Sequence, residues 1–349
     1  MRGTKLEMYE NINVETVAID VITSCNLNCI HCYNRKDDDI GNMCYESILM
    51  IVDKFSIYGV SEIIISGGEP LMHPDIDSIM RMPLSYPKIN FTIATNCMLF
   101  SENLSVCAEQ IDNLTIQISM DGSSAEIYEK QRGIGSYDAF TKGFLLLAQS
   151  SIRRKSAKIA VSRINYRDVE NVYRLLVEHG ICPSFQFVDN VGNAKDNWEC
   201  LSLSLAQKMH VINTIKKMNT QYDKEIPIPV PAPSCVFSEF QERKTFLVGA
   251  DGSVTVCQWL CDYPIGNILH ESLPDILRNE KMMYLYEMGS KRYDALKMSS
   301  TCVSCGIRWN CPLGCLGMAL SNGDEYGYDG ECAFRKAETA FKFLNHNNG

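Results

Sequence analysis

The chain has 349 residues, of which 46% are hydrophobic and 21% charged, a composition typical of a globular protein with room for two domains of ~150 residues. Acidic residues outnumber basic ones by 42 to 33, and the net charge of -9 argues against a surface that grips nucleic acid. No hydrophobic run approaches the ~20 residues that cross a bilayer, and the N-terminal segment MRGTKLEMYENINVE has no hydrophobic signal core, so we expect a cytoplasmic protein that binds neither nucleic acid nor membrane.

Short hydrophobic runs alternate with helical patterns through the first half of the chain. The sequence predicts strands at residues 17–23, 62–67, 89–95, 113–120, 157–164 and 184–189, with helices between them at 44–57, 75–82, 101–110, 136–149 and 168–179. Hydrophobic strands joined by helices favour a parallel sheet. Six such units are fewer than the eight of a closed barrel, so we expect an open, partial (β/α)6 barrel of the α/β class.

The second part of the chain has a weaker periodicity. A predicted helix at 204–219 precedes the segment EIPIPVPAPS, whose prolines favour a domain boundary. A hairpin with an Asp251-Gly252 turn follows, then a helix at 273–288, a cysteine-rich region and a closing helix at 332–344. The predicted organisation is a barrel domain at 1–225 and a small, cysteine-rich α+β domain at 226–349 that ends in a helix.

Cysteine is unusually frequent, with 16 residues in a chain that shows no export signal. Thiols at this density in a reducing compartment indicate metal binding rather than disulfide bonds. Five of them stand alone in the sequence and are expected to be buried thiols that act as small hydrophobic side chains: Cys44, Cys97, Cys107, Cys182 and Cys200. The others form an N-terminal triplet and a C-terminal series.

The triplet Cys25, Cys29 and Cys32 has the spacing C-x3-C-x2-C and directly follows the first predicted strand. Its thiolates would therefore lie at the carboxyl end of a parallel sheet, where such folds bind ligands. Three thiolates suit three irons of a four-iron cluster and leave the fourth iron available to another ligand. A zinc site is the alternative, but zinc usually takes four ligands in paired spacings.

A second motif, SGGEP, ends the second predicted strand at residues 66–70. Adjacent glycines let a ligand approach the backbone closely, and the carboxylate beside them could bind an ammonium group. A tight turn between a strand and a helix would explain the same residues. Its place at the same edge of the sheet as the triplet favours a ligand site.

Together, these motifs resemble those of the radical S-adenosylmethionine (SAM) superfamily, and the resemblance covers essentially the whole chain. It implies that the triplet holds a 4Fe-4S cluster whose fourth iron is chelated by SAM. The methionine amino group would lie on the second motif, at Gly67, Gly68 and Glu69, and His31 would lie against the adenine.

Weaker matches to the same family lie at later strand ends. They are polar residues that would contact the ribose or the carboxylate of SAM, or would only cap turns: Thr95, Asn96, Ser119, Asp121, Ser162 and Asn165. The segment VGNA at 191–194 resembles the adenine-side loop of the family, with Asn193 in place of an arginine.

The C-terminal cysteines resemble the SPASM extension of radical SAM enzymes, a domain that carries two auxiliary iron-sulfur clusters. By the family pattern, the outer cluster would be bound by Cys302, Cys305, Cys311 and Cys332, and the inner one by Cys235, Cys257 and Cys315. Either Cys261 completes the inner set, which we favour, or an open iron is left for substrate. A pair of zinc ribbons is the alternative, but the x5 and x3 spacings do not suit it.

The resemblance implies SAM and three 4Fe-4S clusters as cofactors, which would supply a 5′-deoxyadenosyl radical for hydrogen abstraction from a C–H bond. Auxiliary clusters that accept an electron would make the reaction a net oxidation. The expected partners are a peptide or protein substrate and a one-electron donor such as flavodoxin or ferredoxin. Because the first strand begins near residue 17, we also expect that any leader peptide is recognised by a separate protein or by the barrel itself.

An oxidative crosslink in a peptide side chain is the leading hypothesis for the reaction, because most SPASM enzymes modify ribosomal peptides or proteins. A peptide epimerase, a sulfatase maturase and a haem-pathway or sugar dehydrogenase remain open. Sulfatase maturation is disfavoured because Gln258 stands where those enzymes have an aspartate base, although Cys261 and Asp262 are candidate catalytic residues nearby. A non-catalytic metal-binding or electron-transfer protein is the alternative outside enzymes.

Overall fold

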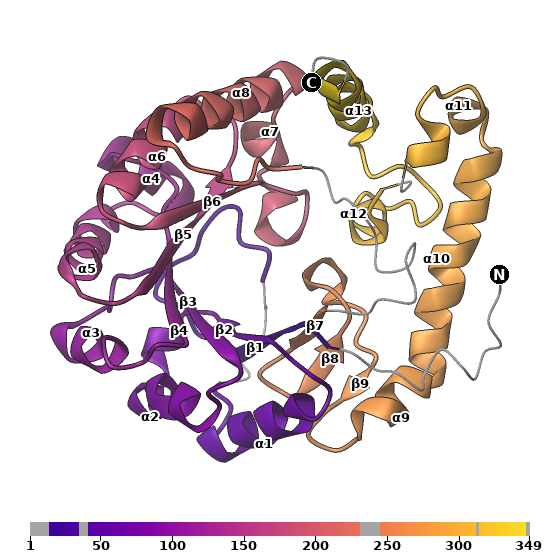
Figure 1. Cartoon of the computed structure of the whole chain (residues 1–349). Helices are drawn as coiled ribbons and strands as arrows, with labels where there is room; N and C mark the ends of the chain where they lie inside the picture. Colours follow the sequence, from indigo (N-terminus) through magenta and orange to yellow (C-terminus); the bar gives the residue numbers. More distant parts are fainter. Residues whose placement is uncertain (1–13, 35–40, 231–244, 312–313, 347–349) are drawn as a thin grey trace.

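One mixed sheet of nine strands forms the centre of the protein (Figure 1), as described by a computed structural model for residues 14–34, 41–230, 245–311 and 314–346. The strand order is β6-β5-β4-β3-β2-β1-β7-β8-β9. The first six strands are parallel: β1 Thr16–Ile22, β2 Glu62–Gly67, β3 Asn90–Thr95, β4 Leu114–Ser119, β5 Arg154–Val161 and β6 Cys182–Phe187. Within the described ranges the two outer strands do not pair with each other, so the expected open, partial barrel is confirmed.

Helices cover the outer face of these six strands (Figure 1). They are α1 Tyr45–Ser56, α2 Ile76–Arg81, α3 Glu102–Ala108, α4 Ala125–Arg132, α5 Tyr137–Gln149, α6 Val169–Glu178 and α8 Leu205–Tyr222, while the short helix α7 Trp198–Leu201 lies near the turn after β5, where the Arg163 N–H donates to the Leu201 carbonyl. The longest of them, α8, begins with a capping box in which the Ser204 and Gln207 side chains bind each other's backbone N–H groups.

The two faces of the parallel sheet differ in polarity. On β4, Ile116 and Ile118 are buried against the helices, while Gln117 and Ser119 alternate with them and are half-buried. The same alternation on β5 places Lys158 on the inner face of the barrel. The hydrophobic face therefore builds the core, and a polar face lines the interior, where a ligand can bind.

A hairpin from the second part of the chain extends this sheet. Strand β7, Thr245–Val248, pairs in parallel with β1 and turns into β8, Ser253–Thr255, which pairs with β9, Gly266–Asn267. The predicted turn is present, with Gly252 at a φ of +81° and the Asp251 carboxylate accepting a hydrogen bond from the Ser253 N–H. A domain boundary near residue 225 stays a prediction.

The remaining helices lie on the open side of the barrel (Figure 1). They are α9 Leu273–Arg278, α10 Glu280–Met298, α11 Ser300–Val303, α12 Leu316–Ser321 and α13 Cys332–His346. The ring of Phe334 in α13 lies edge-on to Phe187 at the end of β6, with 5.6 Å between the ring centroids. In the described ranges no helix is both long enough and hydrophobic enough to cross a membrane.

Several predicted elements differ from the structure, each for a local reason. The fifth strand ends at Val161 rather than at residue 164, because Ser162 and Asn165 form a turn in which the Asn165 side chain accepts the Ser162 N–H. The predicted helix at 273–288 is two helices, separated at Asn279, whose side chain caps α10 by accepting the Met282 N–H. Helix α4 was not predicted, since its sequence AEIYEKQR has no hydrophobic stripe.

The contact between α1 and β7 yields a stability test. Phe55 is fully buried, and its ring centroid lies 6.0 Å from that of Phe246 in β7. We expect Phe55→Ala to lower the free energy of unfolding by about 3–5 kcal/mol, as other large cavities in cores do. Chemical denaturation followed by circular dichroism measures this, with Ile57→Ala as the control, because the Ile57 side chain is 75% exposed. Equal midpoints for the two variants would contradict the packing described here.

Candidate functional site

The cysteine triplet lies in the loop that follows β1, at the carboxyl end of the sheet. The Cys32 N–H donates to the Cys29 carbonyl at 3.2 Å, and the Ile30 N–H donates to the Gln131 carbonyl of α4 at 3.0 Å. All three cysteines line a pocket of about 530 Å³, and Gly67 and Gly68 line the same pocket. The structure therefore brings the two sequence motifs into one site.

The thiols have the donor chemistry that an iron-sulfur cluster needs. Burial raises the pKa of the Cys25, Cys29 and Cys32 thiols, and the nearby Arg132 guanidinium opposes this effect. Thiolates in such surroundings are stabilised when they bind a metal. Among the described residues no three potential ligands converge on a single ion, and a four-iron cluster does not require this, because each thiolate binds its own iron.

Two glycines fix the distance between the cysteine loop and Glu69. The Gly68 N–H donates to the Ile22 carbonyl at 2.7 Å, and the Glu69 N–H donates to the Ser24 carbonyl at 3.0 Å. A Cβ atom on Gly68 would lie 2.1 Å from the Ser24 oxygen, and Gly67 has a φ of +131°. Both positions therefore require glycine.

Glu69 is almost completely buried, with 1% of its surface exposed. One carboxylate oxygen accepts hydrogen bonds from the Thr95 hydroxyl at 2.6 Å and the Leu71 N–H at 3.0 Å, and the other accepts the Asn96 N–H at 2.7 Å. Burial raises the pKa of Glu69, and these hydrogen bonds oppose the rise. Thr95 and Asn96 thus hold Glu69 in place, and their contact with SAM stays a prediction.

A second buried carboxylate, Asp121, binds two side chains beside the cysteine loop. Its Oδ2 lies 2.7 Å from Arg132 Nε and 3.2 Å from His31 Nε2. Burial lowers the pKa of His31 to about 4, although the Asp121 carboxylate acts against this, so the ring is neutral at pH 7. These three residues, with Ser119, line one side of the barrel interior or support its wall.

Arg132 was missed by the sequence analysis. It ends α4, a helix without a hydrophobic stripe, and its ion-pair partner Asp121 lies in the loop between β4 and α4. No local motif therefore marks it. The ion pair with Asp121 is made through Nε, and the guanidinium also lies over the Tyr128 ring, 5.8 Å from its centroid. Its terminal nitrogens are suited to bind a carboxylate, since arginine binds such groups in a bidentate manner.

Ser162 and Asn165 are buried turn residues in the structure. The Ser162 hydroxyl donates to the Gln131 side chain, and the Asn165 side chain donates to the carbonyls of Asp121 and Ala160, each at 2.9 Å. These hydrogen bonds connect the turn after β5 to the Asp121 loop and hold that loop in place. A direct contact of either side chain with SAM stays a prediction.

The four cysteines assigned to the outer cluster lie among α11, the loop that follows it, and the start of α13. Burial raises the pKa of Cys332, and the Cys311 and Cys302 sulfurs lie close enough to raise it further. A buried ion pair between Asp329 and Arg335 supports this region, and the Asp329 carboxylate accepts the Cys315 N–H at 2.8 Å. Arg335 keeps the pKa of Asp329 low although burial acts against it.

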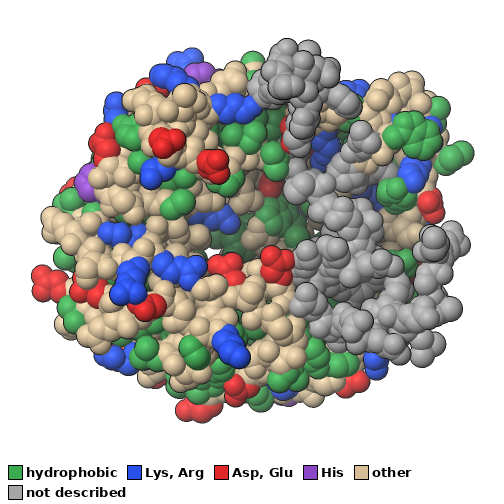
Figure 2. Space-filling view, in the orientation of Figure 1, with side chains coloured by type: hydrophobic (Ala, Val, Ile, Leu, Met, Phe, Trp, Pro, Cys, Tyr) green, Lys and Arg blue, Asp and Glu red, His purple; other side chains and the backbone are tan. Residues whose placement is uncertain are grey.

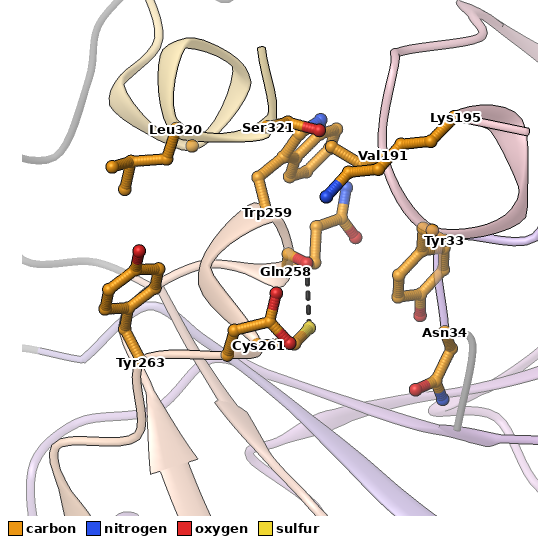
Figure 3. A pocket seen from close by; sticks show the side chains of 13 residues that line it. Tyr33, Asn34, Val191, Lys195, Gln258, Trp259, Cys261, Tyr263, Leu320 and Ser321 are labelled. Carbon is orange, nitrogen blue, oxygen red and sulfur yellow. Dashed lines mark hydrogen bonds between the residues drawn. The ribbon is translucent and has the colours of Figure 1, made fainter. Parts of the chain in front are cut away.

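The region of the inner set is described only in part. Cys235 lies outside the described residues. The Cys261 thiol donates to the Gln258 carbonyl at 2.8 Å and faces a pocket of about 550 Å³ (Figure 3). Asp262 and Tyr33 line the same pocket. Whether Cys261 binds the inner cluster stays a prediction.

A third, smaller cavity of about 180 Å³ lies in the barrel interior. It shares four lining residues with the pocket in Figure 3: Tyr33, Val191, Gln258 and Trp259. The space-filling view shows the molecule hollowed at its centre (Figure 2). The segment that follows Cys257 thus forms part of the wall of the barrel interior.

Comparison with known families agrees with this arrangement. Residues 19–176 match the radical SAM superfamily, and residues 235–306 match the SPASM family, an iron-sulfur cluster-binding domain. The two matches cover the cysteine triplet and most of the C-terminal cysteine series.

Similar proteins match over most of the chain. The mycofactocin maturase MftC of Mycobacterium tuberculosis is 21% identical over 335 residues, which cover 93% of this chain and 84% of MftC. The subtilosin biosynthesis protein AlbA of Bacillus subtilis is 23% identical over 329 residues, 90% of this chain and 69% of AlbA. The structure of Streptococcus suis SuiB bound to its precursor peptide SuiA superposes with a TM-score of 0.73 at 17% identity, covering 93% of this chain and 77% of SuiB. This last likeness shows the fold.

The tight contact at Gly68 leads to a test of the site. We expect Gly68→Ala to push the cysteine loop away from Glu69, because its Cβ would overlap the Ser24 carbonyl. Reconstituted protein should then lose roughly a third of its iron and labile sulfide if it holds three clusters of equal size. Iron and sulfide analysis measures this. Of the single cysteines expected to be buried, Cys97 and Cys107 are, but Cys44, Cys182 and Cys200 are exposed, and Cys200→Ala should keep the full iron content. Unchanged iron in Gly68→Ala would show that the loop does not depend on this contact.

Proposed function

We propose that this chain forms an oxidative crosslink in a peptide substrate. It belongs to the radical SAM superfamily and carries a SPASM domain. The observation that carries the proposal is the match along almost the whole chain to MftC and AlbA, named as a maturase and a bacteriocin biosynthesis protein. SuiB, which has the same fold, was solved with a precursor peptide.

Family membership implies SAM, a 4Fe-4S cluster and auxiliary iron-sulfur clusters, which together supply a 5′-deoxyadenosyl radical and a route for electrons. We propose three 4Fe-4S clusters in all. The site residues suit the parts of SAM: the cysteine triplet for the cluster, Glu69 and its glycines for the amino group, Arg132 for the carboxylate, and His31 for the adenine. Its neutral ring suits an uncharged base.

The chain's own contribution is to position the substrate and to exclude water. The polar inner faces of β4, β5 and β6 surround the cavity, and Gln258 and Trp259 close it from the C-terminal region. The larger pocket beside it, lined on one side by Leu320 and Tyr263 (Figure 3), is our proposed site of entry for an extended segment of the substrate. Cys261 is our proposed fourth ligand of the inner cluster, and a small one-electron carrier such as flavodoxin or ferredoxin our proposed reductant.

The cysteine triplet provides the first test. We expect Cys25→Ala, Cys29→Ala and Cys32→Ala each to abolish formation of 5′-deoxyadenosine, because SAM is cleaved only by an electron from a cluster within bonding distance. Chromatography of reactions with dithionite and SAM measures this. Cys182→Ala, at an exposed position outside the site, is the matched control. Cleavage of SAM at the wild-type rate in any of the three variants would reject the assignment.

The mass of the product tests the reaction. With dithionite, SAM and a short peptide encoded beside this gene, a crosslink should lower the peptide mass by two hydrogen atoms for each bond formed. An epimerase would leave the mass unchanged in ordinary water and add one deuteron in heavy water. Turnover stimulated by a porphyrin or a sugar and by no peptide would contradict the proposal.

A further inference from the structure

A carboxylate that the sequence analysis did not single out, Asp189, faces the barrel cavity. It follows the end of β6 and is part of the cavity lining, together with His31, Ser119 and Lys158. Its Oδ2 accepts a hydrogen bond from the Trp259 indole Nε1–H at 2.9 Å. Trp259 comes from the segment that follows Cys257, so this bond joins the barrel to the C-terminal region.

Only one of the two carboxylate oxygens is used by the protein. Oδ1 of Asp189 accepts no hydrogen bond from the part of the chain that the structure describes. Asp189 is half-buried, so this oxygen is accessible to water or to a ligand in the cavity. It is therefore available to a substrate group in the cavity, which is also lined by His31 and Arg132, two of the residues assigned to SAM.

The surroundings of Asp189 bring the pKa of its carboxyl group close to neutrality. Burial raises the pKa of Asp189 to about 6, although the Trp259 hydrogen bond and the Lys208 ammonium act against this. The charged or titratable groups that face it or share its cavity are Glu331, Asp329, Lys208, Lys158, Arg132, His31 and Tyr33. Lys208 is paired with Glu331, and Arg132 with Asp121, so neither neutralises Asp189 fully.

We propose that Asp189 accepts the proton that leaves the substrate when the new bond forms, and that Trp259 positions it. The inference rests on the proposed function. In the balanced reaction, one C–H group of the peptide loses a hydrogen atom to the 5′-deoxyadenosyl group. A second group of the peptide, an N–H, O–H, S–H or C–H, gives its proton to Asp189, and its heavy atom forms the new bond to the carbon of the first. One electron passes to an oxidised iron-sulfur cluster of the SPASM domain. The peptide thus loses two hydrogen atoms overall.

The matched variants are Asp189→Asn, Asp189→Glu, Trp259→Phe and, as a control, Glu126→Gln at an exposed site in α4. Asparagine keeps the shape and still accepts the indole N–H, but it cannot accept a proton. We expect Asp189→Asn to lower the ratio of crosslinked peptide to 5′-deoxyadenosine about 100-fold, in the range of general-base effects. Asp189→Glu should recover part of the lost ratio of crosslinked peptide to 5′-deoxyadenosine, and Glu126→Gln should have the wild-type ratio.

The pH dependence separates a proton acceptor from a residue that only shapes the cavity. In the wild type, product formation should fall as the pH drops through about 6, because a protonated carboxyl no longer accepts a proton. This inflection should be absent in Asp189→Asn. In Trp259→Phe it should move to higher pH, since the indole hydrogen bond stabilises the carboxylate.

A second readout does not depend on turnover. Infrared difference spectra of the protein between pH 5 and pH 7 should show a carboxyl band that titrates near pH 6 in the wild type and is missing in Asp189→Asn. An unchanged product ratio and pH profile in Asp189→Asn would overturn the proposal, as would a loss confined to Asp262→Asn. If the wild type modifies no peptide at all, the proposed function itself fails, which is a separate outcome.

Discussion

The backbone contact between the SGGEP motif and the end of β1 determines the geometry of the site. Because Gly67 and Gly68 have no side chains, their peptide groups lie directly against Ile22 and Ser24. The cysteine loop continues directly from Ser24, and Glu69 follows directly after Gly68. The spacing between the thiols and the carboxylate is therefore set by two backbone hydrogen bonds, and such bonds leave little freedom for the groups that they connect.

Buried charges complete the site around this contact. Asp121 holds Arg132 and His31 together, and the turn at Ser162 and Asn165 holds the Asp121 loop. A buried ion pair contributes little to stability by itself, since removing two charges from water is costly. Its value here is to fix a guanidinium and a neutral imidazole beside the cysteine loop. On the other side of the cavity, the Trp259 indole N–H holds the Asp189 carboxylate in place by a hydrogen bond.

The sequence predicted the parts of this site that follow local rules. The cysteine triplet and SGGEP each lie within one short segment at a strand end, and the order of strands and helices was sufficient to predict the open barrel. Arg132 was not predicted, because its ion pair with Asp121 in the preceding loop belongs to no local motif. Asp189 was not predicted, because its partner Trp259 lies far away in the chain. The extension of the sheet by β7 was missed for the same reason, since its pairing with β1 joins residues 16–19 to residues 245–248. Thr95 and Asn96 were found as polar residues at a strand end, but their hydrogen bonds to Glu69 emerged only from the structure.

We propose that the cysteine loop and the Glu69 segment together present SAM to an open iron of the cluster. Electron-nuclear double resonance of the reduced protein, with SAM labelled by nitrogen-15 in its amino group, tests this directly. We expect a nitrogen coupling strong enough to show a bond between that amino group and iron. The absence of any such coupling, in protein that carries its full iron content and has SAM bound, would contradict it.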